Sequence, residues 1–540
     1  MNSPGVHDAA AAAAVVALVL LLTRRLTVRP LREKSRPAPV TLAVIASLLA
    51  GAVGCSGGAE HRTAGAPTAD MSGGARPRWG ACPAADAGTG GGAPVRRDPR
   101  QQCTTVRVPL DYRAPGGRLL TIEVSRIRSG APRPKSLMTG QGGPGGSGLD
   151  LPSHDLSALP ARVTRTTDLY GLDYRGIGHS DPLHCGIAPS DRTTATGISY
   201  PAADGSIDAN VAWARRVASA CAQHAGSALP FFNTVNIARD INRIRIALGL
   251  RTLSYTGTSY GTFVGQVYAS LYPATSGRVL LDSVVPPGGV KAAIQNKGRG
   301  VEDAFGGFAR WAAARDSTYR LGGSAPDVRR TVLSTVRELN GTPLPLMTGK
   351  SLTGNLLLEA AQVLLEQQGY FPGLAELLGA AHAGSIPADV TSKLQFDSVF
   401  PDNFFSAQDA IVCNDSVWPK DVAGYRRAVT RSAELFPLTA GSPANIWPCA
   451  FWPLAGSDHP PKPVPRGPHN ILMTQNTQDP STPLSEARRT LRAFGGRAAM
   501  VTVEATGHGV ALAKGCAADA VADFLLGESP VRSRHCPAPR

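Results

Sequence analysis

The sequence predicts an α/β protein in which a doubly wound, mostly parallel sheet carries helices on both faces and a helical lid is inserted into it. Two observations predict this architecture. Short β-branched apolar runs alternate with amphipathic helical patterns along most of the 540 residues. The alternation stops between about residues 288 and 410, where apolar residues recur at helical spacing and no strand pattern stands out.

Each element follows from its local pattern. The expected strands cover residues 119–127, 136–139, 168–173, 253–256, 279–285, 471–474 and 500–504. The expected helices between them cover residues 235–248, 260–272, 483–494 and 517–526. We therefore expect a core made of two parts, residues 79–287 and 411–540, with a helical lid over residues 288–410.

The N-terminal residues 1–54 contain two apolar runs separated by six basic side chains. The second run ends in small residues before Cys55, which is typical of an export signal. Two alternatives stay open at this point: lipidation of Cys55, which would anchor the protein to a membrane, or ordinary cleavage nearby. Residues 55–78 are rich in Gly, Ala, Pro and Thr and read as a flexible linker. We therefore expect a secreted or cell-surface protein.

The cysteines agree with export. Setting Cys55 aside, the other eight form four local couples, for which we expect disulfides between nearest neighbours: Cys82 with Cys103, Cys185 with Cys221, Cys413 with Cys449, and Cys516 with Cys536. Eight cysteines allow 105 connectivities, and buried free thiols are the alternative. The spacing does not match a metal site, so we expect no metal. We also expect no organic cofactor.

The net charge of +15 does not indicate a nucleic-acid partner. The basic excess is scattered arginine, part of it in the leader, without a Lys/Arg block in the body of the chain. No basic stripe interleaved with aromatic residues is visible either, so we expect no nucleic-acid binding.

A G-x-S-x-G pattern at residues 257–261 places Ser259 between an expected strand and an expected helix. That order is what an α/β-hydrolase fold needs to lift a serine hydroxyl above the sheet. In such folds the acid and then the base follow the serine along the chain. His508, flanked by glycines after the strand 500–504, is the candidate base, and Asp479 is the candidate acid. His179 is the rival base, but it precedes the serine.

The oxyanion of an acyl-transfer reaction needs backbone donors. We expect them at Tyr260, directly after the candidate nucleophile, and at Gly143 in the glycine-rich segment 140–148. This segment also matches the dinucleotide pattern G-x-G-x-x-G. Pro144 and the further glycines, in positions where a helix would have to run, argue against a nucleotide site.

Six segments together resemble one family, the secreted actinobacterial tripeptidyl aminopeptidases and their proline-iminopeptidase-like relatives in the α/β-hydrolase superfamily. They are residues 108–112, 142–148, 173–180, 257–262, 479–483 and 507–509. The resemblance implies a serine exopeptidase that releases short peptides, typically tripeptides, from free N-termini through an acyl-enzyme. It makes Ser259 the nucleophile, His508 the base and then the acid, and Asp479 the residue that orients the base.

The same resemblance implies that carboxylates near the lid bind the substrate ammonium group, and Asp415 is the candidate. The sequence departs from the family at Gln141, before the glycine run, where relatives often have His, Asn or Pro. Two other functions stay open: an exported esterase or amidase that uses the same triad on small molecules, and a non-catalytic protein that keeps the fold.

Overall fold

The computed structural model describes residues 77–84, 96–192, 199–346, 350–390, 400–453, 458–528 and 532–538. Nine strands form one sheet in the order β1-β2-β4-β3-β5-β6-β9-β10-β11. The strands are β1 (Gln102–Pro109), β2 (Leu119–Ile127), β3 (Lys135–Gly140), β4 (Thr167–Leu172), β5 (Leu253–Thr258), β6 (Ser276–Asp282), β9 (Ile471–Gln478), β10 (Ala498–Thr506) and β11 (Arg534–Cys536).

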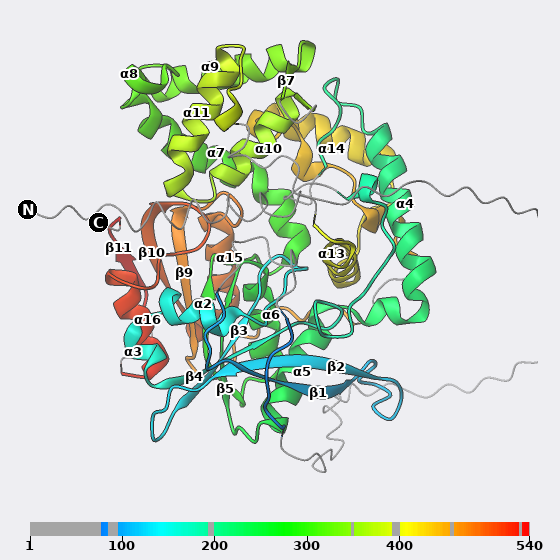
Figure 1. Cartoon of the computed structure of the whole chain (residues 1–540), viewed down its shortest axis with the longest axis vertical. Helices are drawn as coiled ribbons and strands as arrows, with labels where there is room; N and C mark the ends of the chain where they lie inside the picture. Colours follow the sequence, from blue (N-terminus) through cyan, green and yellow to red (C-terminus); the bar gives the residue numbers. More distant parts are fainter. Residues whose placement is uncertain are drawn as a thin grey trace, which may run out of the picture. The chain divides into compact units, whose positions relative to one another are not determined.

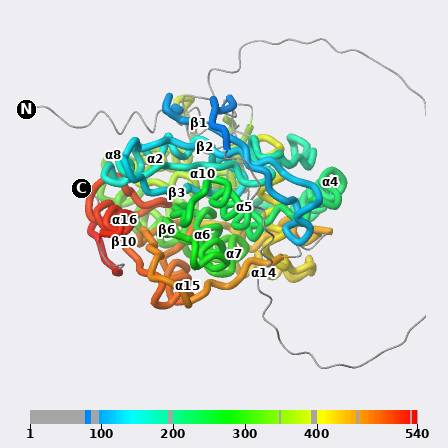
Figure 2. Tube along the Cα trace, turned by 90° about the horizontal axis from the view of Figure 1, so that it is seen from below, coloured from blue at the N-terminus to red at the C-terminus, as the bar shows by residue number. Residues whose placement is uncertain are grey.

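The sheet is antiparallel at one margin and parallel elsewhere. β1 pairs with β2 and β2 with β4 in antiparallel fashion, whereas every pair from β4 to β11 is parallel. β1 and β2, blue in Figure 2, lie at one margin, and the red C-terminal segment with β11 lies at the other. The carboxyl ends of β5, β6, β9 and β10 therefore meet along one edge of the sheet.

Helices cover both faces because alternate strand side chains are apolar on both sides. One face packs against α5 (Thr234–Ala247), α6 (Tyr260–Leu271) and α15 (Leu484–Phe494), and the other against α2 (Leu151–Ala158), α3 (Ala161–Thr164) and α16 (Cys516–Leu526). In β6, for example, Val279 and Leu281 belong to the core under α6, whereas Leu280 belongs to the core under α16. This alternation is what a strand buried on both faces requires. α4 (Asp208–Ala225) lies between β4 and α5 in the chain.

Among the described residues between β6 and β9, none joins the nine-stranded sheet. The helices described there are α7 (Gly289–Ala313), α8 (Asp316–Tyr319), α9 (Ala325–Gly341), α10 (Gly354–Leu364), α11 (Phe371–His382), α13 (Asp402–Asp415) and α14 (Val422–Leu435), with a small hairpin of β7 (Leu344–Pro345) and β8 (Ser351–Leu352). α8, α9, α10 and α11 gather at the top of Figure 1, on the side of the sheet where its parallel strands end. A separate hydrophobic core that includes Phe305, Phe308 and Phe371 holds these helices together.

The expected elements are present with small shifts at their ends. The strands expected from sequence correspond to β2, β3, β4, β5, β6, β9 and β10, and the expected helices to α5, α6, α15 and α16. Outside the segment between β6 and β9, the structure adds the strands β1 and β11 and the helices α2, α3 and α4, which the sequence analysis did not single out. The sheet resumes only at Ile471, and residue 410, the expected end of the lid, lies inside α13.

The eight cysteines pair as Cys82–Cys103, Cys185–Cys221, Cys413–Cys449 and Cys516–Cys536, which are the nearest-neighbour couples expected from sequence. Residues 1–54, where we expect an export signal, Cys55 and nearly all of the expected linker lie outside the described residues. Within the described ranges, no helix has the length and apolar character needed to cross a bilayer. The same ranges hold no cluster of three or more His, Cys, Asp or Glu side chains suited to a metal ion.

Candidate active site

Ser259 occupies the turn between β5 and α6. Its φ of 57° is one of the few positive values at a non-glycine residue, as expected for a serine held on a strained elbow. A Cβ atom on Gly257 would lie 2.5 Å from the Gly261 carbonyl oxygen, and one on Gly261 would lie 2.6 Å from the Gly140 carbonyl oxygen. Both glycines of the pattern are thus required by close backbone contact. The Ser259 residue is partly exposed.

Asp479 and His508 form a close pair at the ends of β9 and β10. The imidazole Nδ1 lies 3.0 Å from each carboxylate oxygen of Asp479. The Asp479 side chain is fully buried, and the backbone N–H groups of Ser481 and Thr482 donate to it at 2.9 and 2.8 Å. The amide of Gln475 adds a third N–H donor at 3.1 Å. A carboxylate held in this way orients the imidazole so that Nδ1 donates to Asp479 and Nε2 remains to accept a proton.

The charges of this pair favour an ionised acid beside a basic imidazole. Burial alone would raise the pKa of Asp479, but the attraction of His508 outweighs it and the pKa is lowered. Burial alone would lower the pKa of His508, yet Asp479, with smaller contributions from Glu366 and Asp282, raises it to about 9. The site therefore stabilises the imidazolium that a general base forms when it takes a proton.

The loops that carry Ser259 and His508 are both attached to the end of β6. The Ser259 N–H donates to the carbonyl of Asp282 at 3.0 Å. On the other side, the Gly509 N–H donates to the Ser283 hydroxyl at 2.7 Å, and the Val510 N–H lies 3.2 Å from both carboxylate oxygens of Asp282. Two consecutive residues of β6 and its following turn thus support the candidate nucleophile and the loop of the candidate base.

The glycine-rich loop after β3 lies against the elbow. A Cβ atom on Gly142 would be 3.4 Å from the Cβ of Ser259, and Gly143, with φ 102°, precedes Pro144 through a cis peptide bond. Tyr260 is the first residue of α6, where backbone N–H groups have no partner within the helix. Of the expected donors, Tyr260 directly follows the serine in the chain, and Gly143 belongs to the loop whose Gly142 lies against the serine.

Asp173 holds the glycine-rich loop in place. Its buried carboxylate accepts the Ser147 hydroxyl at 2.5 Å and the Gly148 N–H at 2.9 Å. The same carboxylate accepts the N–H of His179 at 2.9 Å and lies 3.4 Å from its Nδ1. His179, the rival base, is thus placed beside Asp173, whereas His508 is paired with Asp479.

The lid contacts the loops of the candidate acid and base directly. The carbonyl of Glu366, after α10, accepts the His508 N–H at 2.7 Å, and its carboxylate accepts the Ser481 hydroxyl at 2.7 Å. On α7, a Cβ atom on Gly300 would lie 2.6 Å from the Pro480 carbonyl oxygen. Lid helices thus pack on the backbone of both loops.

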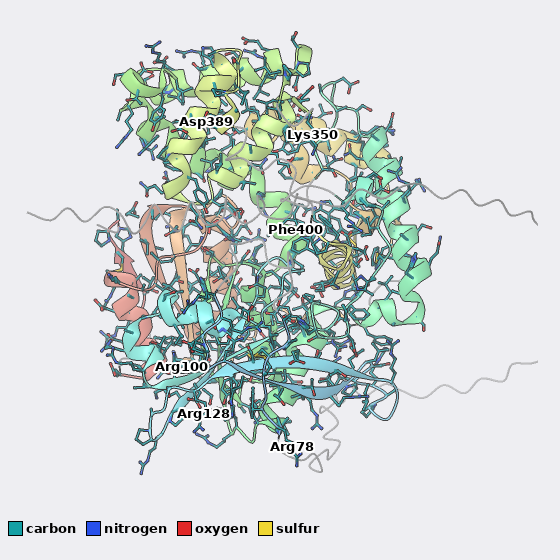
Figure 3. All side chains as sticks on the ribbon, viewed as in Figure 1. Arg78, Arg100, Arg128, Lys350, Asp389 and Phe400 are labelled. Carbon is teal, nitrogen blue, oxygen red and sulfur yellow. A yellow bond between two sulfur atoms is a disulfide. The ribbon has the colours of Figure 1, made fainter. Side chains whose placement is uncertain are left out.

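α13 forms a wall beside the glycine-rich loop. The Gln408 amide donates to the Pro144 carbonyl at 3.3 Å, and a Cβ atom on Gly145 would lie 2.6 Å from the Phe404 carbonyl oxygen. Phe400, labelled in Figure 3 between the sheet half and the lid helices, stacks on Phe404 with ring centroids 4.3 Å apart. α13 therefore packs directly against the glycine-rich loop.

Two buried carboxylates of α13 differ in their surroundings. Asp415 accepts the N–H and the hydroxyl of Thr234 at 2.8 and 2.5 Å, and burial raises its pKa to about 7. It also lines an open hollow of about 430 Å³ together with Lys291 and His459. Asp409 is 5% exposed and makes no hydrogen bond or ion pair with any of the described residues, and burial raises its pKa to about 8. Of these two carboxylates, Asp415 alone has a hydrogen-bond partner within the part of the chain that the structure describes.

The sequence analysis missed Asp282, Ser283, Glu366 and Gln475. For Asp282 and Ser283 a signal exists, because two polar residues interrupt an apolar run at the end of an expected strand. For Glu366 no comparable signal exists, since its contacts with residues 481 and 508 join parts of the chain more than a hundred positions apart.

The sheet, the serine elbow and the Asp–His pair define an α/β-hydrolase of the serine hydrolase class. Comparison with known proteins agrees. The alpha/beta hydrolase fold family matches residues 141–318, and the TAP-like protein family matches residues 438–536.

The relatives are peptidases and an esterase. The tripeptidyl aminopeptidase of Streptomyces lividans is 31% identical over 81% of this chain and 83% of its own length. The serine protease Hip1 of Mycobacterium tuberculosis H37Rv is 27% identical over 79% and 85%, and carboxylesterase B of the same strain is 29% identical over 81% and 86%. The chain belongs to the tripeptidyl aminopeptidase family of α/β-hydrolases and is a serine peptidase.

Proposed function

We propose that the protein is an exported serine exopeptidase that releases short peptides, tripeptides in particular, from free N-termini through an acyl-enzyme. The observation that carries the proposal is the Asp479–His508 pair. Asp282 holds both the loop that follows His508 and the strained elbow of Ser259. The released length rests on the activity named for the Streptomyces relative.

The proposed reaction uses the chain's own groups. The Oγ of Ser259 attacks the scissile carbonyl while Nε2 of His508 takes the hydroxyl proton. The amides of Gly143 and Tyr260 stabilise the oxyanion. The C–N bond then breaks, the imidazolium returns its proton to the leaving amine, and a water activated by His508 hydrolyses the acyl-enzyme. Asp479 stays ionised throughout and holds the imidazole.

Recognition of a free N-terminus requires a group that pairs with an ammonium ion. Asp415, the candidate from sequence, already holds Thr234. Asp409 is two turns earlier on α13, next to Gln408 at the glycine-rich loop, and has no partner among the described residues. A buried carboxyl without a partner gains most from a bound cation. We therefore favour Asp409 as the ammonium ligand and keep Asp415 as the alternative.

Export is supported by the four disulfides, since such bonds persist in oxidising compartments. We propose that the leader directs export and that Cys55 is the site of any lipid anchor. Intact-mass measurement of the mature protein tests whether Cys55 is lipidated. A diacylglyceryl group on Cys55 supports a lipid-anchored enzyme, and an unmodified N-terminus downstream of Cys55 supports a freely secreted one.

Mass spectrometry of the products of a defined decapeptide tests the proposed activity. We expect successive tripeptides from the free peptide and no cleavage of the same peptide with an acetylated N-terminus. The Ser259→Ala variant controls for contaminating peptidases. In the same assay Asp409→Asn and Asp415→Asn show which carboxylate binds the ammonium, because the relevant variant loses discrimination between free and acetylated peptides. Internal cleavage, or equal cleavage of both peptides, contradicts an exopeptidase.

A second candidate is an exported esterase or amidase that acts on small molecules through the same triad. The similarity to carboxylesterase B favours it. Turnover of short-chain aryl esters without cleavage of any peptide amide would support this candidate over the first.

A further inference from the structure

The end of β6 holds a buried carboxylate that the proposed reaction does not use. Asp282 is 3% exposed and is the last residue of β6, between the strands that lead to Ser259 and to Asp479. Its hydrogen bonds go to residues of three different loops or strands. It has no ion pair with a Lys or Arg side chain among the described residues, so its charge is not balanced by a fixed cation.

The backbone of Asp282 contacts the turn of Ser259, and its side chain contacts the loop that follows His508. Its carbonyl accepts the Ser259 N–H at 3.0 Å, at the point where the elbow has a positive φ. Its carboxylate lies 3.2 Å from the N–H of Val510, two residues after His508, and accepts the Thr474 hydroxyl at 2.7 Å. One residue therefore touches both the nucleophile turn and the loop of the base.

The next residues extend this support to the acid. Ser283, with φ 55°, accepts the Gly509 N–H on its hydroxyl at 2.7 Å. The Val284 N–H donates to the side-chain oxygen of Gln475 at 2.8 Å, and the amide of Gln475 donates to Asp479. The segment after β6 thus connects Ser259, His508 and Asp479 through a continuous set of hydrogen bonds.

We propose that Asp282 is a positioning residue, which fixes the loop of His508 relative to Ser259 and adds a further negative charge near the imidazole. The inference rests on the proposed triad and does not depend on whether the substrate is a peptide or an ester. Asp282 is not a catalytic residue in this account, since it acts through the loop and the charge of His508.

The negative charge of Asp282 raises the pKa of His508. The charged groups that act on His508 are Asp479 after β9, Glu366 of the lid and Asp282 of β6, and all three raise its pKa. Burial raises the pKa of Asp282 to about 6, while its hydrogen bonds with Thr474 and Val510 lower it. Asp282 is therefore mostly ionised at neutral pH. Removing its charge must lower the pKa of His508 and move the acidic limb of reactivity to lower pH.

The test is the rate at which an alkyl fluorophosphonate inactivates the purified full-length protein between pH 5 and pH 10. This reagent reports the Ser259–His508 reactivity without a substrate. For Asp282→Asn we expect a plateau rate lowered by about tenfold to a hundredfold, because small displacements of reacting groups are costly. We also expect the acidic limb to move down by about 0.5 to 1 pH unit, because a neighbouring charge is lost.

Thr474→Val is the matched control, because it removes one hydrogen bond to Asp282 and keeps the carboxylate. Losing this bond raises the pKa of Asp282 from about 6, but we expect it to stay below the pKa of His508, about 9, which sets the acidic limb. We expect a smaller loss of rate and an acidic limb at the wild-type pH. Ser283→Ala removes the bond to Gly509 and serves as the second variant if Asp282→Asn does not fold. It should slow inactivation, also without a shift of the limb.

An Asp282→Asn protein with the wild-type melting temperature and an unmoved acidic limb overturns the proposal, whether or not the plateau rate falls, since a purely structural role leaves the limb in place. For the second variant, a Ser283→Ala protein that is inactivated at the wild-type rate also overturns the proposal. Ser259→Ala serves as the unreactive control in this experiment. A wild-type protein that does not react at all overturns the proposed triad and this inference together. A reactive wild-type protein that cleaves no peptide overturns only the proposed peptidase activity.

Discussion

Replacing Asp409 by Asn should stabilise the protein at alkaline pH and not at acidic pH. Burial raises the pKa of this carboxyl from 3.8 to about 8. That increase of about 4 pH units corresponds to roughly 5 kcal/mol at 1.36 kcal/mol per unit, and relaxation of the site reduces the cost to a few kcal/mol. The amide of Asn has almost the same shape and cannot ionise, so it avoids this cost.

The sign follows from the two states of the carboxyl. Below about pH 4 it is protonated in the folded and in the unfolded chain, and its ionisation costs nothing. Between pH 4 and pH 8 the unfolded chain ionises while the folded chain does not, so the unfolding free energy of the wild type decreases as the pH rises. Above pH 8 the cost is constant. Asp409→Asn lacks this decrease.

Thermal unfolding under non-reducing conditions from pH 4.5 to pH 9 measures the effect. We expect the melting temperature of Asp409→Asn to exceed that of the wild type by several degrees at pH 8, and the difference to shrink toward zero or reverse at pH 4.5. A difference that is the same at both pH values would refute the reasoning, because it would show that Asp409 is already ionised with a partner. A residue that lowers stability in this way is typical of a functional site.

Three further predictions follow from the site and the disulfides. The kcat/KM of peptide cleavage should have an acidic limb above pH 6.5, because the neighbouring carboxylates raise the pKa of His508, and a limb at pH 6 or below would contradict the assigned charges. Gly261→Ala should lower kcat/KM by about a hundredfold or prevent folding, since its Cβ would lie 2.6 Å from the Gly140 carbonyl oxygen, and kinetics of the soluble variant with circular dichroism would check this. Replacing Cys413 and Cys449 together by Ser should lower the unfolding free energy by about 2 to 4 kcal/mol, measured as a lower denaturation midpoint in guanidinium, and an unchanged midpoint would show that the bond does not form.

Much of the fold was predictable because its strands are short, apolar and buried on both faces. β5, β6 and β9 are buried along most of their length, so their sequences read as short apolar runs. The helix α15 has a clear exposed face, which gives its sequence a helical period. β11 was missed because three residues that pair with one neighbour carry no periodic signal.

The parts of the candidate site that depend on short sequence patterns were predictable. The turn around Ser259 and the glycines beside His508 have patterns that follow from close backbone contacts. Contacts formed only by folding were not predictable, such as the carbonyl of Glu366 on His508. The helical spacing around Asp409 resembles that of any buried helix, so its lack of a partner among the described residues became visible only in three dimensions.

Peptide mapping of the covalent adduct formed with a fluorophosphonate tests the central claim most directly. The account predicts a single phosphonylated residue, Ser259, with the adduct absent from Ser259→Ala and formed far more slowly in His508→Ala. An adduct on a different residue, or one that forms in Ser259→Ala at the wild-type rate, would contradict the account.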